Sequence, residues 1–123
     1  MRFIETEIAV AVHERQLAEH GGLSGTKDIG LLESAMGRPL NKHSYGETDL
    51  CALAAAYAFG IARNHPFNDG NKRTAWVIAR LFLRLNDVSI AFEKTDAIET
   101  VLALAAGQLP EERLTEWFGS KIV

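Results

Sequence analysis

A short polar cluster contains the residue types that could do chemistry. Between His65 and Arg73 the sequence places a histidine, a carboxylate, a glycine, an asparagine and two cations, with strongly apolar segments on both sides. Imidazole accepts protons near neutral pH, so His65 is a candidate general base for a hydroxyl group. Gly70 lets an anion approach the backbone, and Asn71 adds an amide donor. Lys72 and Arg73 add positive charge, and the planar guanidinium of Arg73 can bind phosphate oxygens.

Asp69 is out of place in a simple anion site, because its charge would repel phosphate. A divalent cation between the two groups removes this repulsion, and Mg²⁺ commonly binds through one or two carboxylates together with substrate phosphates. The cluster therefore predicts transfer of a phosphorus group from a Mg²⁺–nucleotide to a hydroxyl group.

Each residue of the cluster also has a plainer interpretation when it is taken alone. His65 could be a structural histidine, Asp69 a turn residue or helix cap, and the two cations solvated charges. Phe67 is most simply an anchor in the core, and we keep that interpretation. The G-x-x-x-x-G-K-[ST] phosphate loop is absent from the sequence. No further Cys or His stands at ligand spacing to complete a zinc site with His65 and Asp69.

The segments on either side of the cluster are expected to be the two most buried helices. Thr48 or Asp49 should open a helix that runs to Asn64 and is apolar on all sides. Pro66 disfavours helix in the residues before it, so residues 65–70 should form a tight loop. The next helix should begin near Asn71 and run to residue 86. Its first turn would present unpaired N–H groups and the positive end of the helix dipole to an anion.

The rest of the chain also reads as helical, which predicts an all-α, compact helical bundle of about six helices in one domain, 1–123. A first helix should be capped by Thr6, bury a face with Ile8, Ala11 and Val12, and end at residues 21–22. Asp28 should cap a short helix over residues 29–37. Residues 38–48 contain Pro, Asn, Ser and Gly without a helical period, which indicates an irregular loop or small hairpin. Residues 88–92 should be extended, and residues 96–106 and 111–118 should be helices.

Composition limits the class of protein but does not identify it. The chain has 123 residues, of which 47% are hydrophobic and 24% charged, and its net charge is −3, so nothing indicates direct nucleic-acid binding. The single cysteine, Cys51, lies in an apolar segment and is treated as core; it cannot form an internal disulfide, which fits a reducing cytoplasm. We see no signal peptide, and no apolar run reaches the ~18 residues of a membrane span.

The cluster resembles a known family motif. "HPFNDGNKR" is similar to the Fic/Doc superfamily signature His-x-Phe-x-(Asp/Glu)-(Gly/Ala)-Asn-(Gly/Lys)-Arg, and every fixed position matches. The segment "GGLSGTKDIGLLESAMGRP", from Gly21 to Pro39, and "YGE" from Tyr45 resemble the Doc branch. The resemblance extends from His13 to about Asn86 and implies the compact helical Fic/Doc fold.

The resemblance implies a role for each matching residue. His65 would deprotonate a hydroxyl group of the target, and Asp69 would hold Mg²⁺ as cofactor. Gly70 and Asn71 would form an anion-binding turn, and Lys72 and Arg73 would contact the phosphates of ATP. Phe67 would anchor the loop. A flap beside the target chain is expected at Leu40, Asn41, Lys42, His43, Ser44 and Tyr45.

Two positions depart from the AMP-transferring Fic pattern, which reads Gly-Asn-Gly-Arg-x-x-Arg. Lys72 replaces the second glycine and removes room for outer phosphates, and Trp76 replaces the last arginine. Doc-type proteins also carry lysine at the first of these positions. They are understood to bind ATP inverted and to pass its γ-phosphate to a threonine of elongation factor Tu, halting translation. The resemblance thus implies a cytoplasmic toxin with protein Ser/Thr kinase activity.

The expected regulator is a partner chain. Self-inhibiting Fic enzymes carry (Ser/Thr)-x-x-x-Glu-(Gly/Asn), whereas here Thr95 and Glu99 are followed by Thr100. Without this inhibitor, restraint should come from a Phd-like antitoxin, as in the Doc branch. Two alternatives remain: a Fic-type AMP- or nucleotidyl-transferase, and a catalytically silent protein-binding module. The intact His, Asp, Asn and Arg set argues against the second.

Overall fold

Six α-helices and no strands make up the fold, and the computed structural model describes all residues, 1–123. The prediction of an all-α bundle with about six helices is confirmed. The helices are α1 (Thr6–His20), α2 (Ile29–Ser44), α3 (Leu50–Asn64), α4 (Asn71–Leu85), α5 (Lys94–Ala105) and α6 (Glu111–Ser120). One apolar core draws side chains from all six helices. No helix combines the length and the apolar character that a membrane span requires.

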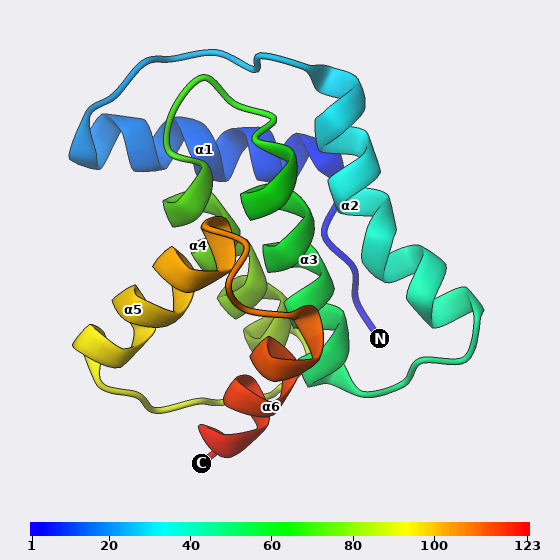
Figure 1. Ribbon diagram of the computed structural model, residues 1–123. Coiled ribbons are helices and arrows are strands. Elements are labelled where there is room, and N and C mark those ends of the chain that lie inside the picture. The colour runs from blue at the N-terminus through cyan, green and yellow to red at the C-terminus, as the bar shows by residue number, and fades with distance from the viewer.

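Helix α3 forms the centre of the bundle and packs against α2, α4, α5 and α6 (Figure 1). It is buried from Cys51 to Ala62 except at Phe59, in agreement with its apolar composition on every side. The Asp49 carboxylate caps the helix by accepting a hydrogen bond of 2.9 Å from the N–H of Cys51. Helix α4 returns beside α3 after residues 65–70. Both central helices therefore have the bounds that the sequence predicted.

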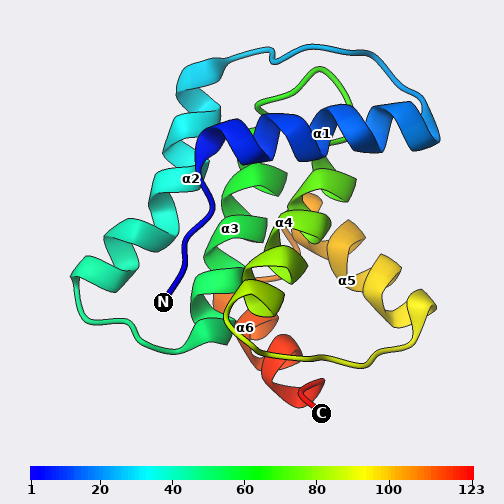
Figure 2. The ribbon, with the colours of Figure 1, turned by 180° about the vertical axis from the view of Figure 1, so that it is seen from behind.

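Helix α1 lies across the end of α3 and α4 that carries residues 65–70 (Figures 1 and 2). Its buried residues are Ala9 and His13, whereas Ile8 is 47% exposed. The predicted apolar face was wrong at Ile8 and Ala11, which are exposed, and right at Val12, which is partly buried and packs against the core. The fully buried residues of the helix are a small alanine and a polar histidine, which give no strong hydrophobic period. The predicted cap was also wrong: Glu5 precedes the helix, and Thr6 is its first residue.

Helix α2 is longer than predicted. Asp28 caps it as expected, with its carboxylate accepting from the N–H of Leu31 at 3.1 Å, but the helix continues through Pro39 to Ser44. A proline inside a helix removes one backbone hydrogen bond and costs about 3 kcal/mol. Two contacts offset this cost. The Pro39 ring is buried, and the last turns are tied to α6, where Glu111 accepts from Arg38 and Lys42.

The expected flap is therefore mostly helical. Residues 40–44 form the last turn of α2, and Tyr45 is its C-terminal cap, so the prediction of an irregular segment over residues 38–44 was wrong. Only the connection over residues 45–49 lies outside a helix. Figures 1 and 2 both place this end of α2 at the opposite end of the bundle from residues 65–70. The last turn of α2 therefore lies away from the loop that carries His65.

The C-terminal third closes the remaining side of the core. Residues 88–92 lie outside the helices as predicted, and Ile90 pairs with Ile122 in an isolated β-bridge. Helices α5 and α6 begin or end within two residues of their predicted bounds. Trp76 of α4 packs here, stacked on Phe118 with ring centroids 5.9 Å apart and edge-on to Phe92 at 5.2 Å.

The packing of α2 on α3 depends on a glycine at their closest approach. A methyl carbon on Gly60 would lie 3.0 Å from the Cα of Ala35 and 3.1 Å from its carbonyl oxygen. Backbone atoms cannot swing away as a side chain does, so Gly60→Ala should force the helices apart. We expect it to lower the free energy of unfolding by about 1–3 kcal/mol, measured by urea denaturation.

Gly37, on α2, is the matched control. Apart from the backbone of its own helix and its chain neighbours, no atom lies within 4 Å of a methyl carbon placed there. Gly37→Ala should therefore raise stability by about 0.5–1 kcal/mol through helix propensity alone. Equal effects of the two substitutions would mean that close approach of α2 and α3 does not limit position 60.

Candidate active site

The loop between α3 and α4 presents His65 to solvent. His65 is exposed and caps α3 in the left-handed region, with φ 49° and ψ 55°, while its N–H donates to the Ile61 carbonyl at 3.2 Å. Glycine is the usual residue at such a helix end, because a side chain there is strained. Non-glycine residues in this conformation gather at functional sites. The fold therefore presents an imidazole to solvent at a position where glycine, which has no side chain, would be more stable.

A side-chain clamp holds the loop in shape. The Asn71 amide accepts a 3.0 Å hydrogen bond from the N–H of Phe67 and donates another 3.0 Å bond to its carbonyl. Phe67 itself is buried at 1% exposure, as the core-anchor interpretation predicted. Sequence reasoning assigned the Asn71 side chain to an anion, whereas the structure uses it to fix the loop. Its backbone N–H donates to no backbone carbonyl and stays available to an anion.

The first turn of α4 offers an anion three unpaired backbone donors. The N–H groups of Asn71, Lys72 and Arg73 donate to no backbone carbonyl, and no side chain caps the helix. Gly70 precedes them with φ 75°. Lys72 and Arg73 are exposed, and neither forms an ion pair. Free cations at the positive end of a helix dipole are unfavourable by themselves, and a bound anion reverses that balance.

Asp69 stands at the edge of this turn with its carboxylate oriented by the backbone. Its Oδ1 accepts from the N–H of Gly70 at 2.8 Å, and its Oδ2 accepts from the N–H of Leu23 at 3.3 Å. These two hydrogen bonds hold the pKa of Asp69 below its usual value, and the nearby charges of Arg73 and Lys72 act in the same direction. The side chain is therefore an exposed, ionised oxygen donor beside the anion-binding turn.

The connection between α1 and α2 supports the loop from outside. The Pro66 carbonyl accepts from the N–H groups of Lys27 and Asp28 at 2.8 and 3.1 Å, and Thr26 forms a β-bridge with Phe67. Asn68 donates through its backbone N–H to Gly25 and through its side chain to Ser24. The sequence predicted no contact between residues 23–28 and this loop. Backbone pairing across some 40 residues has no local signal in the sequence.

Gly22 and His13 complete the surroundings of Asp69, and neither was predicted as a site residue. A methyl carbon on Gly22 would lie 2.9 Å from the Oδ2 of Asp69, and Gly22 has φ 125°, so a side chain there would be strained and would press on the carboxylate. His13 of α1 donates from Nε2 to the Asp69 carbonyl at 2.7 Å. The predicted site residues from 65 to 73 are thus brought together, whereas the flap residues 40–45 are not among them.

The donor set fits Mg²⁺ only together with a bound phosphate. No three His, Cys, Asp or Glu side chains lie close enough to hold a metal by themselves. Asp69 offers hard carboxylate oxygens, each with a lone pair left after its backbone hydrogen bond. Mg²⁺ is often held by one carboxylate, waters and substrate phosphates, and the free N–H groups of α4 would hold those phosphates close by.

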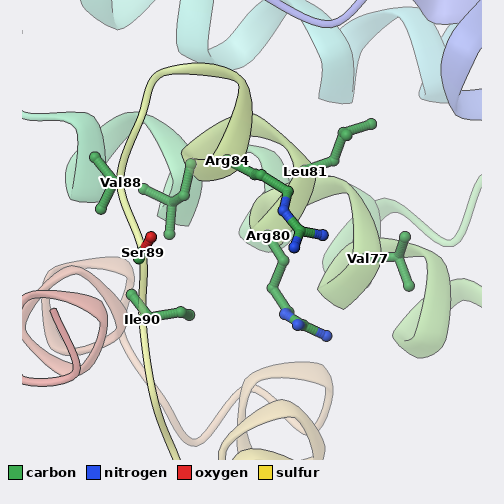
Figure 3. Close-up of a pocket in the computed structure, with 8 residues that line it drawn as sticks. Val77, Arg80, Leu81, Arg84, Val88, Ser89 and Ile90 are labelled. Carbon is green, nitrogen blue, oxygen red and sulfur yellow. The ribbon is translucent and has the colours of Figure 1, made fainter. Parts of the chain in front are cut away.

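Two hollows on the surface lie away from this site. A groove of about 270 Å³ runs between α4 and residues 88–90 and is lined by apolar side chains with Arg80 and Arg84 (Figure 3). A more open hollow of about 600 Å³ surrounds the end of α2 near Arg38 and Lys42. Neither contains a residue of the 65–73 cluster, and neither combines a free carboxylate with a histidine beside unpaired N–H groups. The exposed α3–α4 loop therefore remains the candidate active site.

Comparison with known proteins gives a consistent assignment. A family model described as the Fic/DOC family matches residues 3–83. The chain is 39% identical over 110 residues to Protein kinase doc of Escherichia phage P1, covering 89% of this chain and 86% of that protein. It is 45% identical over 74 residues to Toxin Doc of Mycolicibacterium smegmatis, covering 58% of this chain and 56% of that one.

Proposed function

The chain belongs to the Fic/DOC family, and from that membership and its site we propose that it is a Doc-type toxin with protein kinase activity. It would transfer the γ-phosphate of ATP to a Ser or Thr hydroxyl of a translation factor of the elongation factor Tu type. The observation that carries this proposal is an exposed imidazole, that of His65, on the loop that leads directly into the three unpaired N–H groups at the start of α4. Proton acceptor and phosphate binder stand at the two ends of one loop.

The proposed reaction is a direct displacement at phosphorus. The target hydroxyl oxygen forms a bond to the γ-phosphorus while the bond from that phosphorus to the bridging oxygen of ADP breaks. The hydroxyl proton passes to a ring nitrogen of His65, and ADP leaves with the electron pair of the broken bond. Such reactions depend mainly on positioning and on stabilising the charge of the transferred group. An exposed base accommodates a hydroxyl that belongs to another protein.

The remaining residues of the cluster would bind the nucleotide. The N–H groups that begin α4, with the side chains of Lys72 and Arg73, would hold the phosphates. Asp69 would hold Mg²⁺, which neutralises phosphate charge when bound. The side chain of Lys72 would occupy space that a glycine would leave open for the outer phosphates of the nucleotide. Trp76 packs into the aromatic group with Phe92 and Phe118, which places an indole where the AMP-transferring pattern has an arginine.

The proposal includes a partner and a place of action. Two relatives are named for the doc kinase and the Doc toxin, and this supports a toxin–antitoxin module with a Phd-like antitoxin chain as the restraining partner. A translation factor as target places the activity in the cytoplasm. The sequence carries no self-inhibitory motif, so release of the partner would be the activating event.

Labelled ATP tests the proposed reaction and separates it from AMP transfer. Purified chain, Mg²⁺ and elongation factor Tu are incubated with ATP labelled at either the α or the γ phosphate. We expect label on the factor only from γ-labelled ATP, with one phosphate on a Ser or Thr residue. A matched reaction without Mg²⁺ should show no label.

Transfer of the α label would overturn the kinase assignment and support the nucleotidyl-transferase alternative. Absence of both labels, with the factor and with a whole-cell extract as substrate, would favour a silent binding module. The assay therefore assigns each of the three candidate functions a different result.

A further inference from the structure

His13 is a buried histidine that touches the active-site loop at three points. It lies on α1 with 2% exposure, and its Nε2 donates to the backbone carbonyl of Asp69 at 2.7 Å. Its ring stacks on Phe67 with centroids 3.8 Å apart and planes 5° apart. It also lies against Gly70, where a methyl carbon would be 3.7 Å from the ring. The His13 side chain thus contacts Phe67, Asp69 and Gly70 of the loop, although it belongs to a helix more than 50 residues away in sequence.

These contacts fix one peptide group. The carbonyl of Asp69 is held by His13, and the N–H of the same peptide, that of Gly70, donates to the Asp69 Oδ1 at 2.8 Å. If the peptide rotates, the carboxylate loses this hydrogen bond and the first turn of α4 no longer follows Gly70 in its present direction. The hydrogen bond from His13 therefore helps to orient the Asp69 carboxylate and the unpaired N–H groups of α4, although the imidazole contacts neither.

We infer that His13 is a positioning residue for the phosphate and Mg²⁺ site, acting through its hydrogen bond to the Asp69 carbonyl. The inference rests on the proposed function for the identity of the ligands. The mode of action does not depend on it, because the peptide geometry belongs to the chain alone. Groups that hold a metal-binding side chain in place commonly change metal affinity by 10- to 100-fold when they are removed.

A purely structural role would rest on stacking and volume, and two substitutions separate this from the hydrogen bond. His13→Phe keeps an aromatic ring against Phe67 and removes the donor. His13→Gln loses the ring and keeps an N–H donor of similar reach. If His13 only fills space, the phenylalanine variant should behave normally. If the hydrogen bond positions the loop, the glutamine variant should retain more function.

The test measures binding and loop geometry separately from catalysis. We expect His13→Phe to raise the Mg²⁺ concentration needed for half-maximal binding of a non-hydrolysable ATP analogue by about 10- to 100-fold, and His13→Gln by clearly less. In the ligand-free protein, NMR should show a large shift of the Gly70 amide in His13→Phe and a smaller one in His13→Gln. Leu104→Ala, a core substitution in α5, is the control for general destabilisation and should leave both readouts unchanged.

A His13→Phe variant with normal Mg²⁺ dependence and an unmoved Gly70 amide would overturn the inference. Should that variant not fold, the unmodified protein still decides, because its Nε2 proton should exchange slowly with solvent, and rapid exchange would contradict the hydrogen bond. The amide shift needs no nucleotide. Loss of the kinase proposal alone would leave this signature intact, so the two failures are distinguishable.

Discussion

Replacing His65 with glycine is expected to abolish transfer and at the same time make the protein more stable. Loss of a general base costs roughly 10²–10⁴-fold in rate. His65 occupies a left-handed helix cap with φ 49°, where glycine relieves about 1 kcal/mol of strain. The rate of γ-phosphate transfer and the urea midpoint, measured on the same preparation, should therefore move in opposite directions.

Opposite movement excludes misfolding as the cause of lost activity. His65→Asn adds a second variant, because asparagine tolerates this backbone conformation and provides no base. It should be as inactive as the glycine variant with nearly unchanged stability. His20→Asn, at an exposed position on the last turn of α1, is the matched control and should retain full activity. Full transfer by either His65 variant would remove His65 from the role of base.

The strain at His65 connects the fold to the function. A cap chosen for stability alone would carry glycine, as Gly70 does at the other end of the same loop with φ 75°. The loop tolerates a side chain at its first residue because the rest is held by the Asn71 clamp and by backbone hydrogen bonds from residues 23–28. Rigidity in those neighbours keeps the imidazole at one place for an incoming hydroxyl.

The central helices could be predicted from the sequence because their signals are local. Asp49 as a cap, a segment apolar on all sides, Pro66 and Gly70 all lie within the stretch they define. The face of α1 and the end of α2 could not be predicted, because both depend on distant partners. His13 is buried where the Asp69 carbonyl accepts from it and Phe67 stacks on its ring. Helix α2 continues past Pro39, where Glu111 of α6 binds its side chains.

The candidate site divides in the same way. The cluster from His65 to Arg73 was visible because nine consecutive residues contain it, and its loop-and-helix form follows from Pro66 and Gly70. The supporting groups were not visible: the Leu23 N–H and His13 reach Asp69 across 46 and 56 residues. Every residue except proline has a backbone N–H, so the sequence could not have indicated that the N–H of Leu23 contacts Asp69.

Asp69→Asn is expected to remove Mg²⁺-dependent nucleotide binding with little change in the fold. The substitution keeps one oxygen that can accept from the Gly70 N–H, gives up the longer 3.3 Å hydrogen bond from the Leu23 N–H, and removes the negative charge that a divalent cation requires. Loss of several kcal/mol of metal-assisted charge stabilisation corresponds to about 10²–10³-fold in γ-phosphate transfer. Calorimetric titration with an ATP analogue, with and without Mg²⁺, measures the binding directly.

Asp28→Asn is the matched control for that experiment, because it removes the same charge from the neighbouring connection. Asp28 caps α2 through the N–H of Leu31, and asparagine serves equally well as a cap. Its Mg²⁺ dependence should therefore equal that of the unmodified protein.

A second comparison, between Asp69→Asn and Asp69→Ala, separates two roles of Asp69 itself. If Asp69 serves only to order the backbone at Gly70, Asp69→Asn should retain much of the activity that Asp69→Ala loses. If the charge holds the metal, both variants should lose Mg²⁺ dependence to the same extent, and a Mg²⁺ dependence that survives in both would place the cation at another group.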